Sequence, residues 1–304
     1  LLAGRDYLLD PLGPVFARQG YVTLCIDMPI FGLRATQTES ARAKALLWYD
    51  RALICEMLAD HQAALTYLIS RDDVDHTRVG AFGMSMGCFL SYWLAAVDER
   101  ITAVAHLCCF ADLRSMIRSG AHDGHGFYLV VPGLLDVADA GAIGALIAPR
   151  PQLVCIGEAD RLTPLDAFEL AWHEMSMSYA GYGTLEQLRE PGVGHQETPR
   201  MREAVNLTGE RAELVALEAR LNRGGLGRPR YRLELQPSLA VDPADAPGEP
   251  ERPRIQPVEG LLVGEVVALA VADRHHRLAP ALVGGGEAGL AIDDVQGDRL
   301  ADVL

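Results

Sequence analysis

Residues 78–87 read RVGAFGMSMG, a run of small and apolar residues that contains one serine, Ser85. Arg78–Met84 has the apolar and β-branched character of a buried strand. Met86–Val97, which follows, is apolar nearly all round, as expected of a buried helix. Ser85 therefore stands at a strand-to-helix turn, inside the pattern G-x-S-x-G at Gly83–Gly87, where a serine hydroxyl projects above the sheet. The stretch predicts a nucleophilic serine, and the alternative is a packing turn of small residues.

The same alternation of strand and helix extends along the chain on both sides of this turn. Further strands are expected at Tyr21–Asp27, Ile101–Leu107, Gln152–Gly157 and Leu185–Glu190, and helices over 39–70, as one or as two, and at Thr198–Leu221. Such alternation predicts an α/β protein with a mostly parallel sheet and helices on both faces. Between Asp112 and Ala148 a stretch rich in Gly, His and Asp is expected to form a loop or a small cap over the sheet.

Two later segments supply the groups that a serine nucleophile needs. A histidine must take its proton, and a carboxylate must orient that histidine. The expected chain order is Ser, then Asp or Glu, then His. Asp160 directly follows the strand at Gln152–Gly157, and His195 follows the strand at Leu185–Glu190 on a glycine-rich loop. Because catalytic residues of parallel sheets gather at the carboxyl ends of the strands, both are expected beside Ser85.

Other acidic and imidazole side chains leave alternatives open. Glu158 is a second candidate for the acid, although it also fits a turn residue or a partner of Asp160. His106 lies within a predicted strand and is expected to be a core histidine with its hydrogen bonds satisfied. His122 and His125, in the stretch HDGH, fit a contact to substrate, a metal ligand or plain loop residues, and no further ligands for a metal are evident.

The amino-acid composition argues against several classes of function. The chain has 304 residues and a net charge of −14, which argues against nucleic-acid binding because phosphates demand a basic face. No apolar run reaches the roughly 20 residues of a membrane span. The six cysteines form no CxxC pair, and Cys88 is expected to be a buried core residue. We expect a cytoplasmic protein without metal or cofactor, although the first residue is Leu1, so a signal peptide upstream stays open.

The composition changes near Asn222. Tyr231 is the only aromatic residue from there to the end, and glycine and proline become frequent. Residues 1–221 are therefore expected to form the catalytic domain, and residues 222–304 a low-complexity tail or a small module of unknown function. Within that tail, Gly260–Ala272 is apolar enough for a strand or a short hairpin.

Four segments together resemble the α/β-hydrolase superfamily, and more narrowly the dienelactone hydrolases and the acetyl xylan esterase-like serine esterases. They are GYVTLCIDMPIFG at 20–32, RVGAFGMSMG at 78–87, IAPRPQLVCIGEADRLTP at 147–164 and PGVGHQETPRMREAV at 191–205. The resemblance implies Ser85 as nucleophile, Asp160 as acid and His195 as base. It also implies that Asp27 and Gly32 shape the loop after the strand at Tyr21–Asp27. Dienelactone hydrolases proper use cysteine as nucleophile, so the serine favours the esterase branch.

One departure from the family pattern concerns the oxyanion hole. Such enzymes carry a His-Gly segment after an earlier strand, which supplies a second oxyanion donor, and no His-Gly precedes Tyr21. The resemblance thus implies that the chain lacks the first strands of the sheet and has one oxyanion donor, the backbone N–H of Met86. We expect the chain as it stands to be weakly active or unstable, since loss of one donor costs roughly 10²–10³ in kcat.

These features predict a serine hydrolase that cleaves small-molecule carboxylic esters through an acyl-enzyme intermediate. Phe31, Tyr128 and Trp172 are expected to line the substrate pocket. Two alternatives remain. The first is a peptidase, thioesterase or lactonase with the same triad, because one scaffold supports many substrates. The second is a non-catalytic α/β-hydrolase scaffold that acts as a binding protein.

Overall fold

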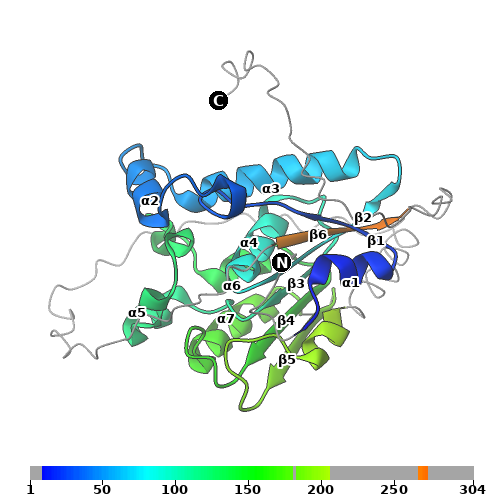
Figure 1. Cartoon of the computed structure of the whole chain (residues 1–304). Helices are drawn as coiled ribbons and strands as arrows, with labels where there is room; N and C mark the ends of the chain where they lie inside the picture. Colours follow the sequence, from blue (N-terminus) through cyan, green and yellow to red (C-terminus); the bar gives the residue numbers. More distant parts are fainter. Residues whose placement is uncertain (1–8, 181–182, 206–265, 273–304) are drawn as a thin grey trace, which may run out of the picture. The chain divides into compact units, whose positions relative to one another are not determined.

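The computed structural model describes residues 9–180, 183–205 and 266–272 (Figure 1). The chain divides into two compact units, Leu1–Asp273 and Arg274–Leu304, and every described residue belongs to the first. The boundary that the composition predicts near Asn222 lies outside the described residues and stays a prediction.

The described strands form one mixed sheet in the order β1-β6-β2-β3-β4-β5. They are β1 (Tyr21–Cys25), β2 (Val74–Met84), β3 (Ala103–Leu107), β4 (Gln152–Gly157), β5 (Leu185–Glu190) and β6 (Val266–Ala272). From β2 to β5 neighbouring strands run parallel. The mostly parallel sheet predicted from the sequence is therefore confirmed.

Strand β6 is the exception in direction and in origin. It pairs antiparallel with β1 on one side, where Tyr21 faces Val271, and with β2 on the other. Its residues come from the segment Gly260–Ala272, for which the sequence predicts a strand or hairpin within a tail. The strand is confirmed over Val266–Ala272, but it lies inside the main sheet between β1 and β2.

The helices include those predicted over 39–70 and at Met86–Val97, together with others not predicted from the sequence. They are α1 (Leu12–Arg18), α2 (Glu39–Leu47), α3 (Leu53–Ile69), α4 (Met86–Val97), α5 (Leu113–Ser119), α6 (Ala140–Ala145) and α7 (Leu165–Met177). The helical stretch over 39–70 is two helices, separated by a turn in which Asp50 has a φ of 56°. Residues 199–205 are helical, and the rest of the helix expected at Thr198–Leu221 lies outside the described residues.

The sheet has a hydrophobic core on each face. Because successive side chains of a strand point to opposite faces, Val104 and Val154 join one core while Ala105 and Leu153 join the other. The first core also contains buried residues of α3, α4, α6 and α7. The second contains residues of α1 and of the helical segment 199–205. Helices therefore cover both faces, as the sequence predicts.

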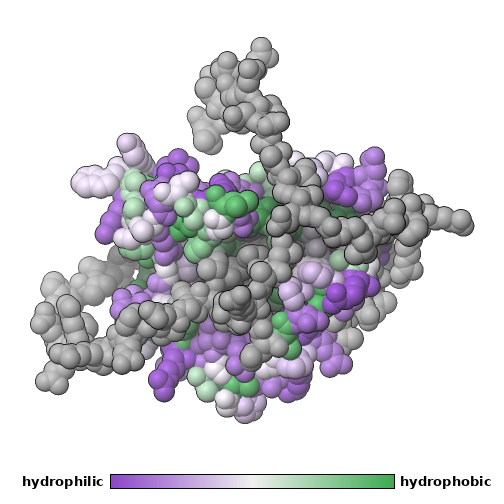
Figure 2. All heavy atoms as spheres, in the orientation of Figure 1, coloured by the Kyte–Doolittle hydropathy of each residue, from purple (hydrophilic) through white to green (hydrophobic). Residues whose placement is uncertain are grey.

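The segment between β3 and β4 is the predicted cap. It comprises α5, the 3₁₀ turns η2 (Ala121–Gly124), η3 (Phe127–Leu129) and η4 (Leu134–Asp136), and α6. A further 3₁₀ turn, η1 (Gly32–Arg34), follows β1. On the face shown in Figure 2, hydrophilic and hydrophobic side chains are interspersed over the described elements. Within the described part of the chain, no helix is both long and apolar enough to cross a bilayer.

Candidate active site

Ser85 occupies a strained backbone conformation between β2 and α4. Its φ of 57° and ψ of −120° fall outside the regions that L-residues ordinarily adopt. Two backbone hydrogen bonds hold it there: its N–H donates to the Leu107 carbonyl at 2.9 Å, and its carbonyl accepts from the Phe89 N–H at 3.1 Å. A Cβ atom on Gly83 would lie 2.0 Å from the carbonyl oxygen of Gly87. The first glycine of the motif is therefore required for the strand and helix to approach this closely.

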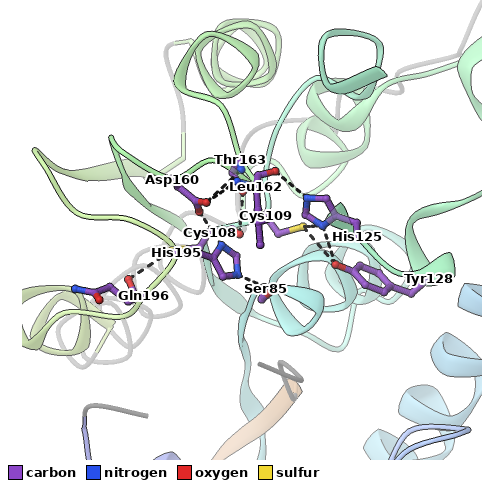
Figure 3. A network of polar contacts seen from close by, with 10 residues as sticks. All are labelled: Ser85, Cys108, Cys109, His125, Tyr128, Asp160, Leu162, Thr163, His195 and Gln196. Carbon is purple, nitrogen blue, oxygen red and sulfur yellow. Dashed lines mark hydrogen bonds and ion pairs between the residues drawn. The ribbon is translucent and has the colours of Figure 1, made fainter. Parts of the chain in front are cut away.

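His195 lies between the serine and a carboxylate (Figure 3). Its Nε2 is 2.8 Å from the Ser85 Oγ, and its Nδ1 is 2.8 Å from the Asp160 Oδ2. An ionised carboxylate only accepts hydrogen bonds, so Nδ1 carries the ring proton and Nε2 is free to accept the serine proton. The structure thus brings together the three residues that the sequence predicts as nucleophile, acid and base, in the geometry that proton transfer from serine requires.

Main-chain contacts join the loop that carries the acid to the loop that carries the base. The N–H of Ala159 donates to the Val193 carbonyl at 2.8 Å, and the N–H of Glu158 donates to the Glu190 carbonyl at 3.0 Å. A Cβ on Gly157 would lie 2.4 Å from the Val193 oxygen. Because no side chain separates the loops at this point, residues distant in sequence meet directly.

The second oxygen of the acid is also fixed. Asp160 Oδ1 accepts hydrogen bonds from the backbone N–H groups of Leu162, at 2.9 Å, and Thr163, at 3.3 Å. The alternative acid, Glu158, faces another partner, since its Oε1 accepts from Arg189 Nε at 2.8 Å. The geometry therefore favours Asp160 over Glu158 as the partner of the histidine.

Comparison with known proteins places the chain in a family. Residues 11–110 match the model of the dienelactone hydrolase family. The chain is also 39% identical over 201 residues to the putative hydrolase YtaP of Bacillus subtilis (strain 168), which covers 65% of this chain and 67% of that protein. The chain belongs to the dienelactone hydrolase family. The resemblance seen in the sequence is confirmed, and this family member is a hydrolase by that relationship.

Solved structures with a similar fold include two kinds of esterase. A glucuronoyl esterase from Solibacter usitatus is 19% identical, with a TM-score of 0.46 over 53% of this chain and 49% of that one. Acetyl xylan esterase 1 from Thermoanaerobacterium sp. JW/SL YS485 is 18% identical, with a TM-score of 0.40 over 53% of each chain. The chain thus spans about half the length of these structures. The α/β-hydrolase fold is evident in this family member itself, where the residues predicted as nucleophile, acid and base follow β2, β4 and β5.

The predicted oxyanion donor of this dienelactone hydrolase family member opens helix α4. Met86 is the first residue of that helix. The first N–H groups of a helix have no acceptor within it, and the helix dipole adds positive potential there. The position of Met86 directly after Ser85 suits a donor to a developing oxyanion, and this role stays a prediction.

The three residues predicted to line the substrate pocket lie in different parts of the molecule. Phe31 packs against the core next to η1, and Trp172 on α7 stacks on Phe168 with ring centroids 6.1 Å apart. Tyr128, in η3, is buried and its hydroxyl lies 3.0 Å from His125 Nδ1. Their role in binding stays a prediction. The loop after β1 is shaped as the resemblance implies, because a Cβ on Gly32 would lie 2.3 Å from Asp27 Cγ.

A cavity of about 330 Å³ lies in the cap of this family member. Apolar side chains of α5 and of the turns after it line most of it, among them Ile117, Phe127 and Leu134. His122 and His125 also line it, whereas the three predicted substrate residues do not. Within the described ranges, no three His, Cys, Asp or Glu side chains lie together as metal ligands.

The cysteines near the site are buried thiols. Cys88 is fully buried on α4, as predicted, and burial raises the pKa of its thiol. Burial likewise raises the pKa of Cys109 to about 12 and raises that of Cys108 further. Because the thiolate is the reactive form, these thiols are inert at neutral pH. Ser85 is thus the nucleophile that the geometry supports.

Proposed function

We propose that this protein is a serine hydrolase that cleaves carboxylic esters, with Ser85 as nucleophile, His195 as general base and Asp160 as the group that orients it. The observation that supports the proposal is the pair of 2.8 Å hydrogen bonds that His195 makes to the other two residues. A histidine bonded in this way can accept the serine proton at Nε2, and the carboxylate then stabilises the imidazolium that results.

In the first half of the reaction, Ser85 Oγ attacks the ester carbonyl carbon as His195 Nε2 takes the hydroxyl proton. The carbonyl oxygen becomes an oxyanion that faces the N–H of Met86. The tetrahedral intermediate then collapses, the bond to the alcohol oxygen breaks, and the histidine gives its proton to that oxygen. The alcohol leaves, and the acyl group remains on Ser85 as an ester.

In the second half, water replaces the alcohol. His195 Nε2 takes a proton from the water as the water oxygen attacks the acyl carbon, and a second tetrahedral intermediate forms. Its collapse breaks the bond to Ser85 Oγ, which recovers the proton from the histidine. The carboxylic acid leaves and the enzyme returns to its first state. No step calls for a cofactor or a metal ion.

The proposed partner is a small-molecule ester, and neither a nucleic acid nor a membrane is proposed. The net charge of −14 opposes binding to phosphate backbones. Cys55, which is exposed, and the buried Cys88, Cys108, Cys109 and Cys155 form no disulfide. Free thiols persist in reducing compartments, which supports the proposal of a cytoplasmic location.

The experiment is turnover of p-nitrophenyl acetate by the full chain and by Ser85→Ala. We expect the substitution to lower kcat by a factor approaching 10⁶, because members of a triad act as a unit. A matched control is Ser91→Ala, a change at a fully buried serine of the same helix whose hydroxyl donates to the Cys88 carbonyl at 2.9 Å. This control is expected to keep its kcat.

A fluorophosphonate probe provides a second readout. It is expected to label the wild type and the Ser91 variant at Ser85 and to leave Ser85→Ala unlabelled. Equal turnover by wild type and Ser85→Ala would contradict the proposal, and an unreactive Ser85 would favour the binding-protein alternative. Turnover of a thioester, a lactone or a peptide in preference to the ester would assign the triad to one of the other hydrolase classes.

A further inference from the structure

His125 joins the cap to the loop that carries the acid. It lies at the end of η2 in the cap, is half-buried, and has a hydrogen-bond partner at each ring nitrogen. Nε2 is 2.8 Å from the backbone carbonyl oxygen of Leu162, and Nδ1 is 3.0 Å from the hydroxyl of Tyr128 (Figure 3). The ring therefore bridges two segments that are far apart in the sequence.

The partners fix the state of the ring. A carbonyl oxygen only accepts, so Nε2 carries the proton and donates to Leu162. Nδ1 is then the acceptor of the Tyr128 hydroxyl proton. Burial lowers the pKa of His125, which favours the neutral ring, and burial raises the pKa of Tyr128, which keeps the phenol protonated. One tautomer of the neutral ring thus satisfies the contacts with Leu162 and Tyr128, while Cys109 Sγ lies farther from Nδ1, at 3.8 Å.

Leu162 links this ring to the triad. Its carbonyl accepts from His125, while its own N–H donates to Asp160 Oδ1 at 2.9 Å. The cap also packs tightly on its side chain, because a Cβ on Gly124 would lie 2.6 Å from Leu162 Cδ2. Leu162 is therefore held from the cap on two sides, and it holds the oxygen of Asp160 that does not face His195.

We propose that His125 is a positioning residue for the acid of the triad. By fixing the peptide of Leu162, it fixes the direction of the Asp160 carboxylate and hence the orientation of His195. The inference rests on the proposed function and adds the cap histidine to the machinery of the same site. It gives one of the two histidines of the HDGH stretch a role other than metal ligand, substrate contact or plain loop.

The experiment compares substitutions that keep or remove the donor to Leu162. In His125→Gln the side-chain amide nitrogen stands near the place of Nε2 and still donates. His125→Asn places an amide near Nδ1 but does not reach Leu162, and His125→Leu fills the space without any donor. We expect the Asn and Leu variants to lose about 10–100-fold in kcat for p-nitrophenyl acetate with KM unchanged, since small misplacements of catalytic groups cost that much. The Gln variant is expected to recover most of the loss.

A spectroscopic readout needs no turnover. The proton on His195 Nδ1, hydrogen-bonded to Asp160, is expected to give a low-field ¹H resonance in wild type and in His125→Gln. In the Asn and Leu variants the resonance should shift upfield or broaden. If wild type fails to hydrolyse any ester, the proposed function fails, while this resonance still tests the link between His125 and the triad.

Three results would overturn the inference. One is an unchanged kcat and resonance in both variants that lack the donor. A second is equal loss in His125→Gln together with a lowered melting temperature, which marks a purely structural residue. A third is a change confined to KM, which would show that His125 only lines the cap cavity and does not position the acid. Use of both Asn and Leu keeps the test decisive if one of them does not fold.

Discussion

Two histidines on the same sheet have opposite surroundings. His106 lies within β3, is fully buried, and has Nε2 2.9 Å from the amide oxygen of Gln152. His195 lies on the loop after β5, between the hydroxyl of Ser85 and the carboxylate of Asp160. Burial lowers the pKa of His106 to about 4, so that ring stays neutral at physiological pH.

The difference shows what makes a histidine a base in this fold. The amide of Gln152 favours the charged ring of His106 too weakly to offset burial, whereas a carboxylate stabilises the imidazolium that forms during proton transfer. In a parallel sheet the carboxyl end of a strand is where loops bring such partners together. The middle of the strand is enclosed by core side chains. The position along the strand therefore separates a buried core histidine from the histidine that we propose as the base.

The same substitution at both histidines tests this contrast most strongly. His195→Gln is expected to lower kcat for p-nitrophenyl acetate by up to about 10⁶-fold with little change in melting temperature. His106→Gln is expected to leave kcat within a few-fold, while the free energy of unfolding falls by about 1–3 kcal/mol because the buried ring that packs on Tyr92 and Phe110 is lost. Steady-state kinetics and urea unfolding of both variants measure the two effects. A large loss of kcat in His106→Gln with an intact fold would remove the distinction.

The carboxylate partner is the next test. Asp160→Asn keeps the shape of the side chain but removes its charge and favours the wrong ring tautomer, so we expect a loss of about 10⁴-fold in kcat. Glu158→Gln is the matched control on the same loop, and it breaks only the ion pair with the partly exposed Arg189. Its kcat is expected to stay within a few-fold of wild type. If the Glu158 variant shows the larger loss, the acid has been assigned to the wrong residue.

A smaller effect concerns the pH dependence of stability. The pKa of His106 falls from its ordinary value of 6.5 to about 4 on folding, because burial disfavours the charged ring. Well above pH 6.5 the His106 ring is neutral in both the folded and the unfolded protein. As the pH falls from 6.5 to 4 the unfolded chain binds a proton that the folded protein does not, so stability declines, by about 3 kcal/mol in all. Urea unfolding between pH 8 and pH 4 measures this decline.

His106→Gln is the control for this slope. His61 and His125 also have pKa values lowered by burial, so they add to the decline in the same direction. The variant is therefore expected to keep a shallower slope than wild type. An identical slope in wild type and variant would show that His106 does not contribute to it.

The local pattern predicts most of the sheet and the meeting of Ser85, Asp160 and His195. The bounds predicted for Gln152–Gly157, Leu185–Glu190 and Met86–Val97 agree with β4, β5 and α4. These segments are short apolar or alternating runs that end at glycine, proline or charged residues. Such residues mark in the sequence where a strand or helix begins and ends. Ser85, Asp160 and His195 could be predicted because each lies shortly after the end of a predicted strand.

What the sequence did not reveal depends on contacts between distant segments. The apolar run at Gly260–Ala272 suggests a strand, but nothing local shows that Val266–Ala272 pairs with both β1 and β2. The bond from His125 to Leu162 is similar, because it joins a cap without clear periodicity to a loop on another strand. Both arise from tertiary packing, for which a single sequence gives no period or spacing.

The main-chain contact between the loops of Asp160 and His195 has a consequence for how the site is assembled. Gly157 packs closely against Val193, and the N–H groups of Glu158 and Ala159 donate to carbonyl oxygens at the end of β5 and on the loop after it, so these loops are held together as one unit. Asp160 and His195 therefore lie on two loops that are held to each other, whereas Ser85 lies on the β2–α4 turn. The three side chains thus come from two supports, and the hydrogen bond between Ser85 Oγ and His195 Nε2 connects those supports at the site.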